Sequence, residues 1–136
     1  MRKVEFLDTS LRDGEQTPGV NFSIKEKVAI AKQLEKWGIA SIEAGFPAAS
    51  PDSFEAVRQI SEAMTTTAVS GLARSVKSDI DACYEALKDA KYPQCQCLHC
   101  YKSYSPRIQI EKEQKKKFLI SSKRHVTYAR SKFVRS

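Results

Sequence analysis

Two kinds of hydrophobic pattern, one typical of buried strands and one typical of helices, alternate along the first 93 residues. Short, nearly continuous apolar runs predict buried strands at residues 3–8, 39–47 and 66–73. Each run is followed by a segment in which apolar residues recur every three or four positions, the spacing of one helix face. The expected inner faces are Ile24, Val28, Ala31, Leu34 and Trp37; Phe54, Val57, Ile60, Ala63 and Met64; and Ile80, Cys83, Tyr84 and Leu87. The pattern therefore predicts strand–helix units.

Capping residues place the helix ends. Ser23 with Glu26 three residues later forms a capping box, and Gly38 ends the first helix. Ser50 or Asp52 caps the second helix. The third helix is expected from about residue 78 to residue 90, with Cys83 on its inner face as a core residue rather than a nucleophile.

Three strand–helix units of about thirty residues each indicate the fold class. Alternating βα units produce a parallel sheet with helices packed on its faces. We expect an α/β fold, a partial (β/α)₈ barrel of the TIM type consisting of its first three to four βα units. The carboxyl ends of barrel strands open onto one face, where active sites form.

Polar residues follow each predicted strand at this face. The first strand runs into the polar cluster from Asp8 to Gln16, the second carries Glu43, and the third ends at Arg74. Carboxylates are the ligands that Mg²⁺ or Mn²⁺ prefers, and Arg12 can clamp a substrate carboxylate with two hydrogen bonds. The alternative is an exposed turn with solvated charges.

Composition changes near Pro93. Residues 1–93 carry 12 Lys or Arg and 14 Asp or Glu, whereas residues 94–136 carry 11 and 2, and together they give the net charge of +7. Three of the four cysteines lie between residues 95 and 100. The sequence shows neither an apolar run of membrane-spanning length nor a signal-peptide pattern, so we expect a soluble cytoplasmic protein without membrane contact.

Three segments carry a resemblance to a known family: FLDTSLRDGEQTPGV, IEAGFPAASPDSFEAV and GLARS. In this order and spacing they closely resemble bacterial 2-isopropylmalate synthases, which belong with the homocitrate and citramalate synthases among metal-dependent barrel enzymes. The resemblance covers residues 1–93. It implies a Claisen-type condensation of acetyl-CoA with 3-methyl-2-oxobutanoate, in leucine biosynthesis.

The resemblance also implies roles for residues at matching positions. Asp13 is similar to the metal ligand, for Mn²⁺ or Mg²⁺ with Zn²⁺ as the alternative, and Asp8 is a second candidate on chemistry alone. Arg12 is similar to the catalytic group that steadies the oxyanion and the 2-oxo acid. The implied substrate-pocket residues are Gln16, Glu43 and Arg74. No residue is assignable as the general base that deprotonates the acetyl group.

The resemblance breaks after about residue 95. Family members continue with a fourth strand of the form HVFIATSP, where this chain has QCLHCYKSYSPRIQIEKEQKKKFLISSK. Codons for CLHCYKSYS can be reread from the second nucleotide as VFIATSPI, and codons for KFLISSK from the third as VLDIIK. We interpret residues 94–124 as an aberrant basic segment, a frameshifted fourth βα unit from about residue 96, and residues 125–136 as the remnant of its helix.

Two other motifs are by-products on this interpretation. Cys95, Cys97, His99 and Cys100 resemble a zinc cluster but are too crowded for a structural zinc site. The run 112–117, with aromatic neighbours, resembles a nucleic-acid patch but forms no known module. A small basic nucleic-acid or zinc-binding protein therefore remains an alternative function, and a citramalate or homocitrate type of synthase is another.

We expect the chain to be the N-terminal part of such an enzyme. Family members place a His-x-His metal pair on a later strand, beyond the units recognised here. We therefore expect small-molecule substrates, no nucleic-acid partner, and a homodimer for the full-length parent. The 136-residue chain by itself is expected to lack synthase activity and to be marginally folded, because an open half-barrel leaves strand edges unpaired.

Overall fold

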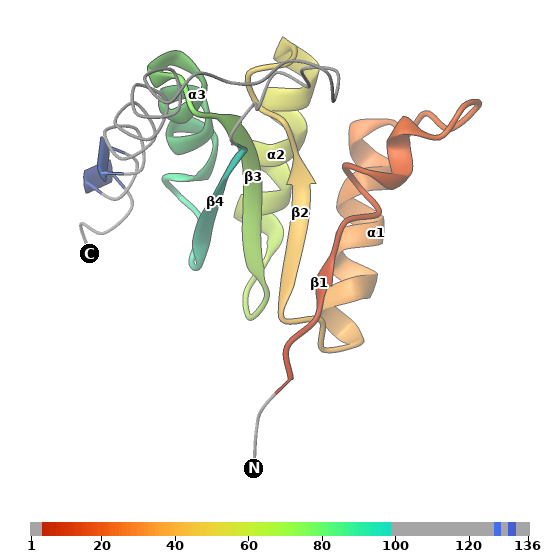
Figure 1. Ribbon diagram of the computed structural model, residues 1–136. Coiled ribbons are helices and arrows are strands. Elements are labelled where there is room, and N and C mark those ends of the chain that lie inside the picture. Colours follow the sequence, from red (N-terminus) through yellow and green to blue (C-terminus); the bar gives the residue numbers. More distant parts are fainter. Residues whose placement is uncertain (1–3, 99–126, 129–130, 133–136) are drawn as a thin grey trace, which may run out of the picture.

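A computed structural model describes residues 4–98, 127–128 and 131–132, and Figure 1 shows its path. The elements in chain order are β1 (Leu7–Asp8), a 3₁₀ turn (Gly14–Gln16), α1 (Ile24–Lys36), β2 (Ser41–Gly45), α2 (Pro51–Ala63), β3 (Ala68–Arg74), α3 (Lys77–Leu87) and β4 (Pro93–Leu98). The four strands form one parallel sheet in the order β1-β2-β3-β4. This is the partial α/β barrel that the sequence predicts.

Helices α1, α2 and α3 cover one face of the sheet, and the other face is turned toward the viewer in Figure 1. Successive residues of a strand point to opposite faces. Ile42 and Ala44 of β2, with Val69 and Ala73 of β3, belong to the core under the helices. Glu43 and Ser70, which lie between them in sequence, therefore point to the open face.

The helix faces predicted from the sequence form this core. Val57, Ile60, Ile80, Cys83 and Leu87 are fully buried. The Ser23 side chain accepts a hydrogen bond from the Glu26 N–H, and the Glu26 carboxylate accepts one from the Ser23 N–H, so the capping box is confirmed. Ser50 is the residue that caps α2. The prediction that Cys83 is a core residue is also confirmed, since its side chain is not accessible to solvent.

Glu35, near the end of α1, holds the loop before β3. Its Oε1 accepts hydrogen bonds from the backbone N–H groups of Thr65 at 2.7 Å, Thr66 at 2.7 Å and Thr67 at 3.1 Å. Burial of the carboxylate raises its pKa, but these backbone bonds and the Thr66 hydroxyl outweigh that effect and lower the pKa to about 2. One side chain thus joins the first and third βα units.

Two expectations at the edges of elements are wrong. Trp37 is 70% exposed, because it is the C-cap residue of α1 and the chain turns away at Gly38, whose φ is +79°. The first strand is shorter than expected, pairing with β2 only at Leu7 and Asp8. Its apolar residues Val4 and Phe6 are 73% and 69% exposed.

The sheet also continues into the segment that the sequence predicts to be aberrant. β4 pairs in parallel with β3 over its whole length, from Pro93 to Leu98. Farther along, the described residues of the predicted fourth helix are helical, and the Tyr128 hydroxyl donates to Asp81 Oδ1 on α3 at 2.5 Å. Residues 99–124 of the proposed frameshifted segment, which begins at about residue 96, lie outside the described residues, as do His99 and Cys100 of the zinc motif.

Candidate functional site

A tight turn after β1 presents the two charged residues Arg12 and Asp13. The carbonyl oxygen of Thr9 accepts the N–H groups of Arg12 at 3.1 Å, Asp13 at 2.7 Å and Gly14 at 3.3 Å. The side chain of Leu11, the residue before Arg12, is fully buried and anchors the turn in the core. The backbone therefore fixes where both side chains start, at the carboxyl end of β1.

Arg12 is held between two carboxylates. Its Nε and Nη2 lie 2.9 Å and 2.8 Å from Glu43 Oε2, and its Nη1 lies 2.7 Å from Asp13 Oδ1. The Arg12 side chain is 23% exposed, so part of the guanidinium faces solvent. A guanidinium has five N–H groups. Nε and Nη1 each donate one hydrogen bond here and Nη2 adds an ion-pair contact to Glu43, which leaves N–H groups to bind an anionic or carbonyl oxygen.

Glu43 is the fully buried member of this cluster, as its position in an apolar run predicts. Because it alternates with the core residues Ile42 and Ala44, its side chain projects from the open face of β2. Asp13 differs from it sharply, with a side chain 62% exposed. The structure thus combines one buried carboxylate that orients Arg12 and one accessible carboxylate beside it.

Lys27 and Glu15 form an ion pair that sequence reasoning missed. Lys27 Nζ lies 2.7 Å from both Glu15 Oε1 and Glu15 Oε2, and Lys27 is nearly buried. The pair ties the 3₁₀ turn to α1. The signal for it was the position of Lys27 three residues after Ile24, on the expected inner face of the helix.

A cavity of about 170 Å³ lies beside this pair. Arg12, Gln16 and Lys27 contribute to its walls, together with Gly45 and Phe46 at the end of β2. Gln16, predicted to bind substrate, therefore lines the same cavity as Arg12. The Lys27–Glu15 pair holds the turn on which Gln16 sits.

Arg74 lies at the carboxyl end of β3, as predicted, and it contacts α3 and the end of β2. Its Nε and Nη2 lie 2.6 Å and 3.2 Å from the two Asp79 carboxylate oxygens, and its guanidinium stacks on the Phe46 ring at 5.4 Å. The hydrogen bond from Arg74 lowers the pKa of Asp79, against the opposing effect of burial. Arg74 thus reaches the cavity wall through Phe46, not through the Arg12 cluster.

Asp8, the second metal candidate, is engaged in a local turn. Its Oδ1 accepts the Ser10 N–H at 3.0 Å, and its Oδ2 accepts the Ser10 hydroxyl at 3.3 Å. This arrangement stabilises the end of β1. Asp13 is 62% exposed and its contact with Arg12 uses Oδ1, so within the described residues Asp13 fits a metal ligand better.

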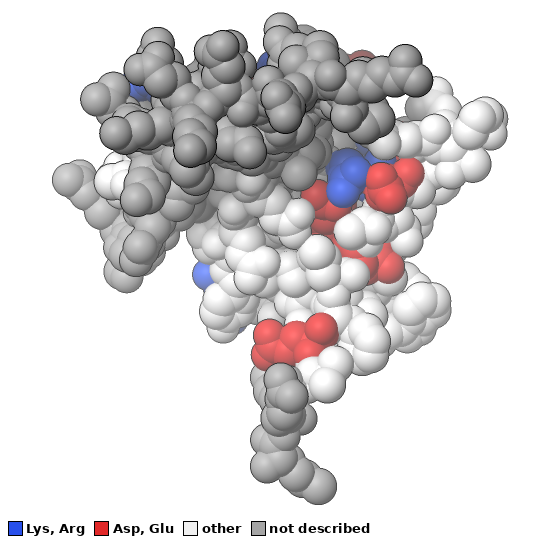
Figure 2. All heavy atoms as spheres, in the orientation of Figure 1, with Lys and Arg blue, Asp and Glu red and all other residues white. Residues whose placement is uncertain are grey.

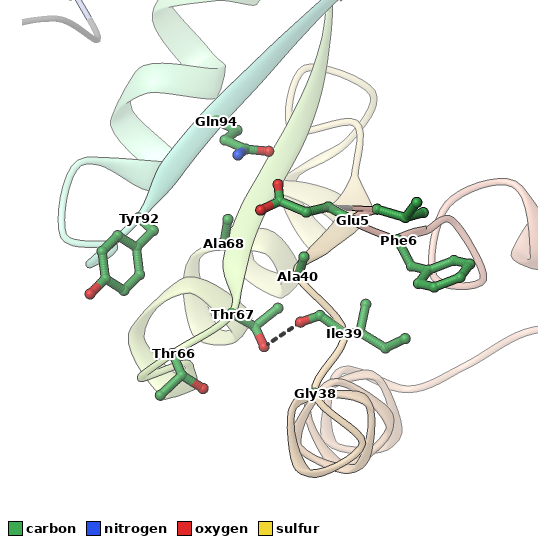
Figure 3. A pocket seen from close by; sticks show the side chains of 11 residues that line it. Glu5, Phe6, Gly38, Ile39, Ala40, Thr66, Thr67, Ala68, Tyr92 and Gln94 are labelled. Atoms are coloured by element: carbon green, nitrogen blue, oxygen red, sulfur yellow. Dashed lines mark hydrogen bonds between the residues drawn. The ribbon is translucent and has the colours of Figure 1, made fainter. Parts of the chain in front are cut away.

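The open face shows where the charges gather. In Figure 2, basic and acidic atoms meet in one small cluster near the upper part of the described surface, while most of that face is uncharged. A larger hollow of about 540 Å³ lies at the opposite, amino-terminal end of the strands (Figure 3). Its walls include Gly38, Ala40 and Ala68, and the Thr67 hydroxyl donates to the Ile39 carbonyl. The cluster around Arg12, which combines a guanidinium with two carboxylates, is therefore a better candidate for a functional site than this hollow.

Residues 4–98 and the described part of the C-terminal helix contain no group of three metal-ligating side chains. Asp13 still suits a hard divalent cation, because it is an accessible carboxylate with one oxygen already oriented by Arg12. It would supply one ligand. None of the described helices is long and apolar enough to cross a bilayer.

Comparison with known proteins decides the family. The sequence matches the HMGL-like family over residues 3–135, nearly its whole length. The chain belongs to the HMGL-like family. Curated relatives with high identity to it are named 2-isopropylmalate synthase.

Three relatives show the extent of the match. A 2-isopropylmalate synthase of Streptococcus gallolyticus (strain UCN34) is 82% identical over 135 residues, which cover 98% of this chain and 25% of the relative. The synthase of Lactococcus lactis subsp. cremoris (strain SK11) is 68% identical over 106 residues, 78% of this chain and 20% of the relative. The synthase of Staphylococcus carnosus (strain TM300) is 55% identical over 136 residues, which cover 98% of this chain and 26% of the relative. The chain spans about a quarter of the length of these relatives.

Proposed function

We propose that this chain supplies the first part of the active site of a 2-isopropylmalate synthase, which joins acetyl-CoA to 3-methyl-2-oxobutanoate. The observation that carries the proposal is the fixed position of Arg12 between buried Glu43 and accessible Asp13. The identity of 82% with a relative of that name agrees with it. The enzyme would act in the cytoplasm, as an acyltransferase of leucine biosynthesis, and the full-length protein would be a homodimer.

Arg12 would bind the oxygen that becomes negative during condensation. Attack on the keto carbon of the 2-oxo acid moves charge onto its carbonyl oxygen, and a guanidinium already oriented by two carboxylates stabilises that charge without reorganisation. Glu43 would hold the guanidinium plane. Gln16, on the wall of the adjacent cavity, would contact the substrate, and Arg74 would contribute from the next strand end.

Asp13 would hold a divalent cation, Mn²⁺ or Mg²⁺, with Zn²⁺ as the alternative. A bound divalent cation polarises a keto carbonyl as a Lewis acid. Asp13 suits it through its exposed carboxylate, whose Oδ1 is kept in place by Arg12 Nη1 at 2.7 Å. The remaining ligands and the general base are outside the residues that this structure assigns.

A hybrid enzyme tests the proposal. In it, residues 1–95 of this chain replace the matching residues of the S. gallolyticus relative. We expect the hybrid to release CoA from acetyl-CoA only when 3-methyl-2-oxobutanoate and a divalent metal are present. The Arg12→Lys variant, which cannot reproduce the guanidinium contacts to both carboxylates, should lose roughly 100-fold in kcat.

Two outcomes would contradict the proposal. An inactive hybrid of normal secondary structure would exclude a synthase site in these residues, and preference for pyruvate or 2-oxoglutarate would indicate a citramalate or homocitrate type of enzyme. Arg58→Lys on the outer face of α2 is the matched control, because Arg58 also pairs with two carboxylates, Glu55 and Glu62. The 136-residue chain alone is expected to release no CoA.

The segment from residue 96 to residue 124 is proposed to be a frameshifted fourth βα unit. Its support is the rereading of the codons, which recovers VFIATSPI and VLDIIK in the order of the family's fourth strand and helix. Residues 1–93 would then be the ordinary barrel units, and residues 125–136 the end of the fourth helix. Resequencing the gene tests this: bases that cannot be reread as a strand and a helix would exclude it.

A further inference from the structure

Two buried polar atoms in the described part of the chain lack a hydrogen-bond partner, and they are neighbours. They are Glu43 Oε1 and Ser70 Oγ. Both residues are fully buried. Leaving a buried polar atom unsatisfied costs about 1–3 kcal/mol. Two such atoms at one place therefore point to a shared purpose.

The sheet register brings the two side chains together. Glu43 on β2 and Ser70 on β3 are direct partners in the parallel ladder. Neighbouring strands lie about 4.8 Å apart, and paired residues project from the same face. Here that is the open face, because Val69 and Gly71, the residues on either side of Ser70, face the helix layer.

Other groups nearby are already engaged. Glu43 Oε2 accepts a hydrogen bond from Arg12 Nε and lies in ion-pair contact with Arg12 Nη2, so Oε1 is the oxygen left to receive another donor. On the other side of Ser70, its ladder partner Gln94 uses Oε1 to accept the Ser41 hydroxyl at 2.8 Å. The Ser70 hydroxyl, on the residue paired directly with Glu43, is thus a polar side-chain group placed to serve Glu43 Oε1.

We propose that Ser70 is a positioning residue for Arg12, acting through Glu43. A water molecule held by Ser70 Oγ donates to Glu43 Oε1 and fixes the rotation of the carboxylate, so that Oε2 stays aligned with the guanidinium. Buried waters commonly bridge polar atoms in this way. The inference deepens the proposed function, on which its catalytic consequence rests, and adds a residue outside the cluster identified from the sequence.

The first test does not depend on activity. In the 136-residue chain, ¹⁵N NMR measures hydrogen exchange at Arg12 Nε–H, the group that donates to Glu43. We expect Ser70→Ala to accelerate this exchange about tenfold, and to have no further effect in a Glu43→Gln background, because coupled residues give non-additive effects. Unchanged exchange in Ser70→Ala, or an equal acceleration in both backgrounds, would overturn the inference.

Two controls separate positioning from packing. Ser61→Ala removes another buried hydroxyl, one that donates to the Arg58 carbonyl at 2.7 Å, and should leave Arg12 exchange unchanged. Ser70→Thr and Ser70→Val have nearly equal volumes, and only threonine keeps the hydroxyl. Slow exchange in the threonine variant and fast exchange in the valine variant would support the inference; equal rates would overturn it.

The second test uses the hybrid enzyme. Ser70→Ala should lower kcat about tenfold and change the KM for acetyl-CoA by less than about twofold, the result of misplacing a group that acts in the transition state. If the unsubstituted hybrid is inactive, the proposed function fails while the exchange experiment still decides the role of Ser70. If the hybrid is active and Ser70→Ala keeps full kcat, the role of Ser70 in positioning is refuted.

Discussion

Arg12 and Glu43, which are 31 residues apart in sequence, meet at a single oxygen: Nε and Nη2 of the arginine both approach Glu43 Oε2, at 2.9 Å and 2.8 Å. The contact joins the loop after β1 to the middle of β2. Its two members have different environments, since Glu43 is fully buried and Arg12 partly faces solvent. The pair should therefore respond unequally to loss of either member.

Replacement of Arg12 should cost more stability than replacement of Glu43. Arg12→Met leaves the buried Glu43 carboxylate without its ion-pair partner, and we expect a loss of about 3 kcal/mol in the free energy of unfolding. Glu43→Gln leaves an arginine that still contacts Asp13 and solvent, and should cost about 1 kcal/mol. Urea unfolding of the 136-residue chain, followed by far-ultraviolet circular dichroism, measures both.

The double variant provides the control for this comparison. Arg12→Met combined with Glu43→Gln removes both charges, so it should be more stable than Arg12→Met alone. A reversed order of the two single variants, or a double variant whose losses simply add, would show that the buried charge is not what makes Arg12 important for stability.

Lys27 should influence substrate binding through the turn that carries Gln16. Its ion pair with Glu15 holds the 3₁₀ turn that carries Gln16. In the hybrid enzyme, Lys27→Met should raise the KM for the 2-oxo acid roughly tenfold, because a displaced turn moves Gln16 away from the cavity wall. Steady-state kinetics with varied 2-oxo acid measures the effect.

Lys36→Met is the matched control, since Lys36 lies in the last turn of the same helix and is exposed. It should leave the KM unchanged. Equal kinetic constants for Lys27→Met and the unsubstituted hybrid would mean that the turn keeps its place without the ion pair.

Glu35 should make stability depend on pH in the acid range. Its pKa in the folded chain is about 2, below the ordinary value of 4.5, because backbone donors favour the charged form. A lowered carboxyl pKa adds stability that is complete above the unfolded value and disappears as pH falls toward the folded value. The stability difference between the unsubstituted chain and Glu35→Gln should therefore shrink from about pH 5 to about pH 2.

Unfolding curves across that range measure the effect. Glu85→Gln is the control, because Glu85 is a carboxylate on the exposed side of α3 paired with Lys88. A Glu35→Gln variant whose stability follows that of the unsubstituted chain at every pH would show that the three threonine N–H groups find other partners.

An alanine at position 71 should fit only if side chains of α3 move away from β3. A Cβ at this position would lie 2.7 Å from Cys83 Sγ and 3.3 Å from Leu87 Cδ1. Gly71→Ala should therefore destabilise the chain by about 1–3 kcal/mol through overpacking. Thermal unfolding should show part of the loss recovered in Gly71→Ala/Cys83→Ala, where the smaller side chain leaves room. A double variant less stable than either single one would argue against this contact.

Local pattern was enough to predict most of the fold. The three strand–helix units, the capping box at Ser23 and the inner faces of α2 and α3 depend on residues within one element, and the structure confirms them. The burial of Glu43 was predictable as well, because this acid lies in the middle of an apolar run. The exposure of Trp37 was not predictable, since an apolar residue at a helix end can face either the core or solvent.

Partners between elements were harder to predict. Sequence reasoning expected Arg74 to converge with Asp13 and Glu43, but the first turn of α3 offers Asp79 only five residues away, and the shorter-range contact forms. Similarly, Lys27 meets Glu15 because the loop between them folds back onto α1. Such pairings depend on loop geometry, which periodicity does not encode. The roles of Arg12, Asp13, Gln16, Glu43 and Arg74 in binding and catalysis remain predictions.

The strand order β1-β2-β3-β4 follows the order of the chain, so each strand pairs with the one made just before it. Contacts between sequence neighbours close small loops, at low cost in chain entropy. During synthesis, a newly completed unit can therefore dock on a sheet edge that already exists, without waiting for distant parts of the polypeptide. At every stage the most recently formed strand would be an unpaired edge of the sheet. The order of synthesis on the ribosome would then determine the order in which the edges become paired.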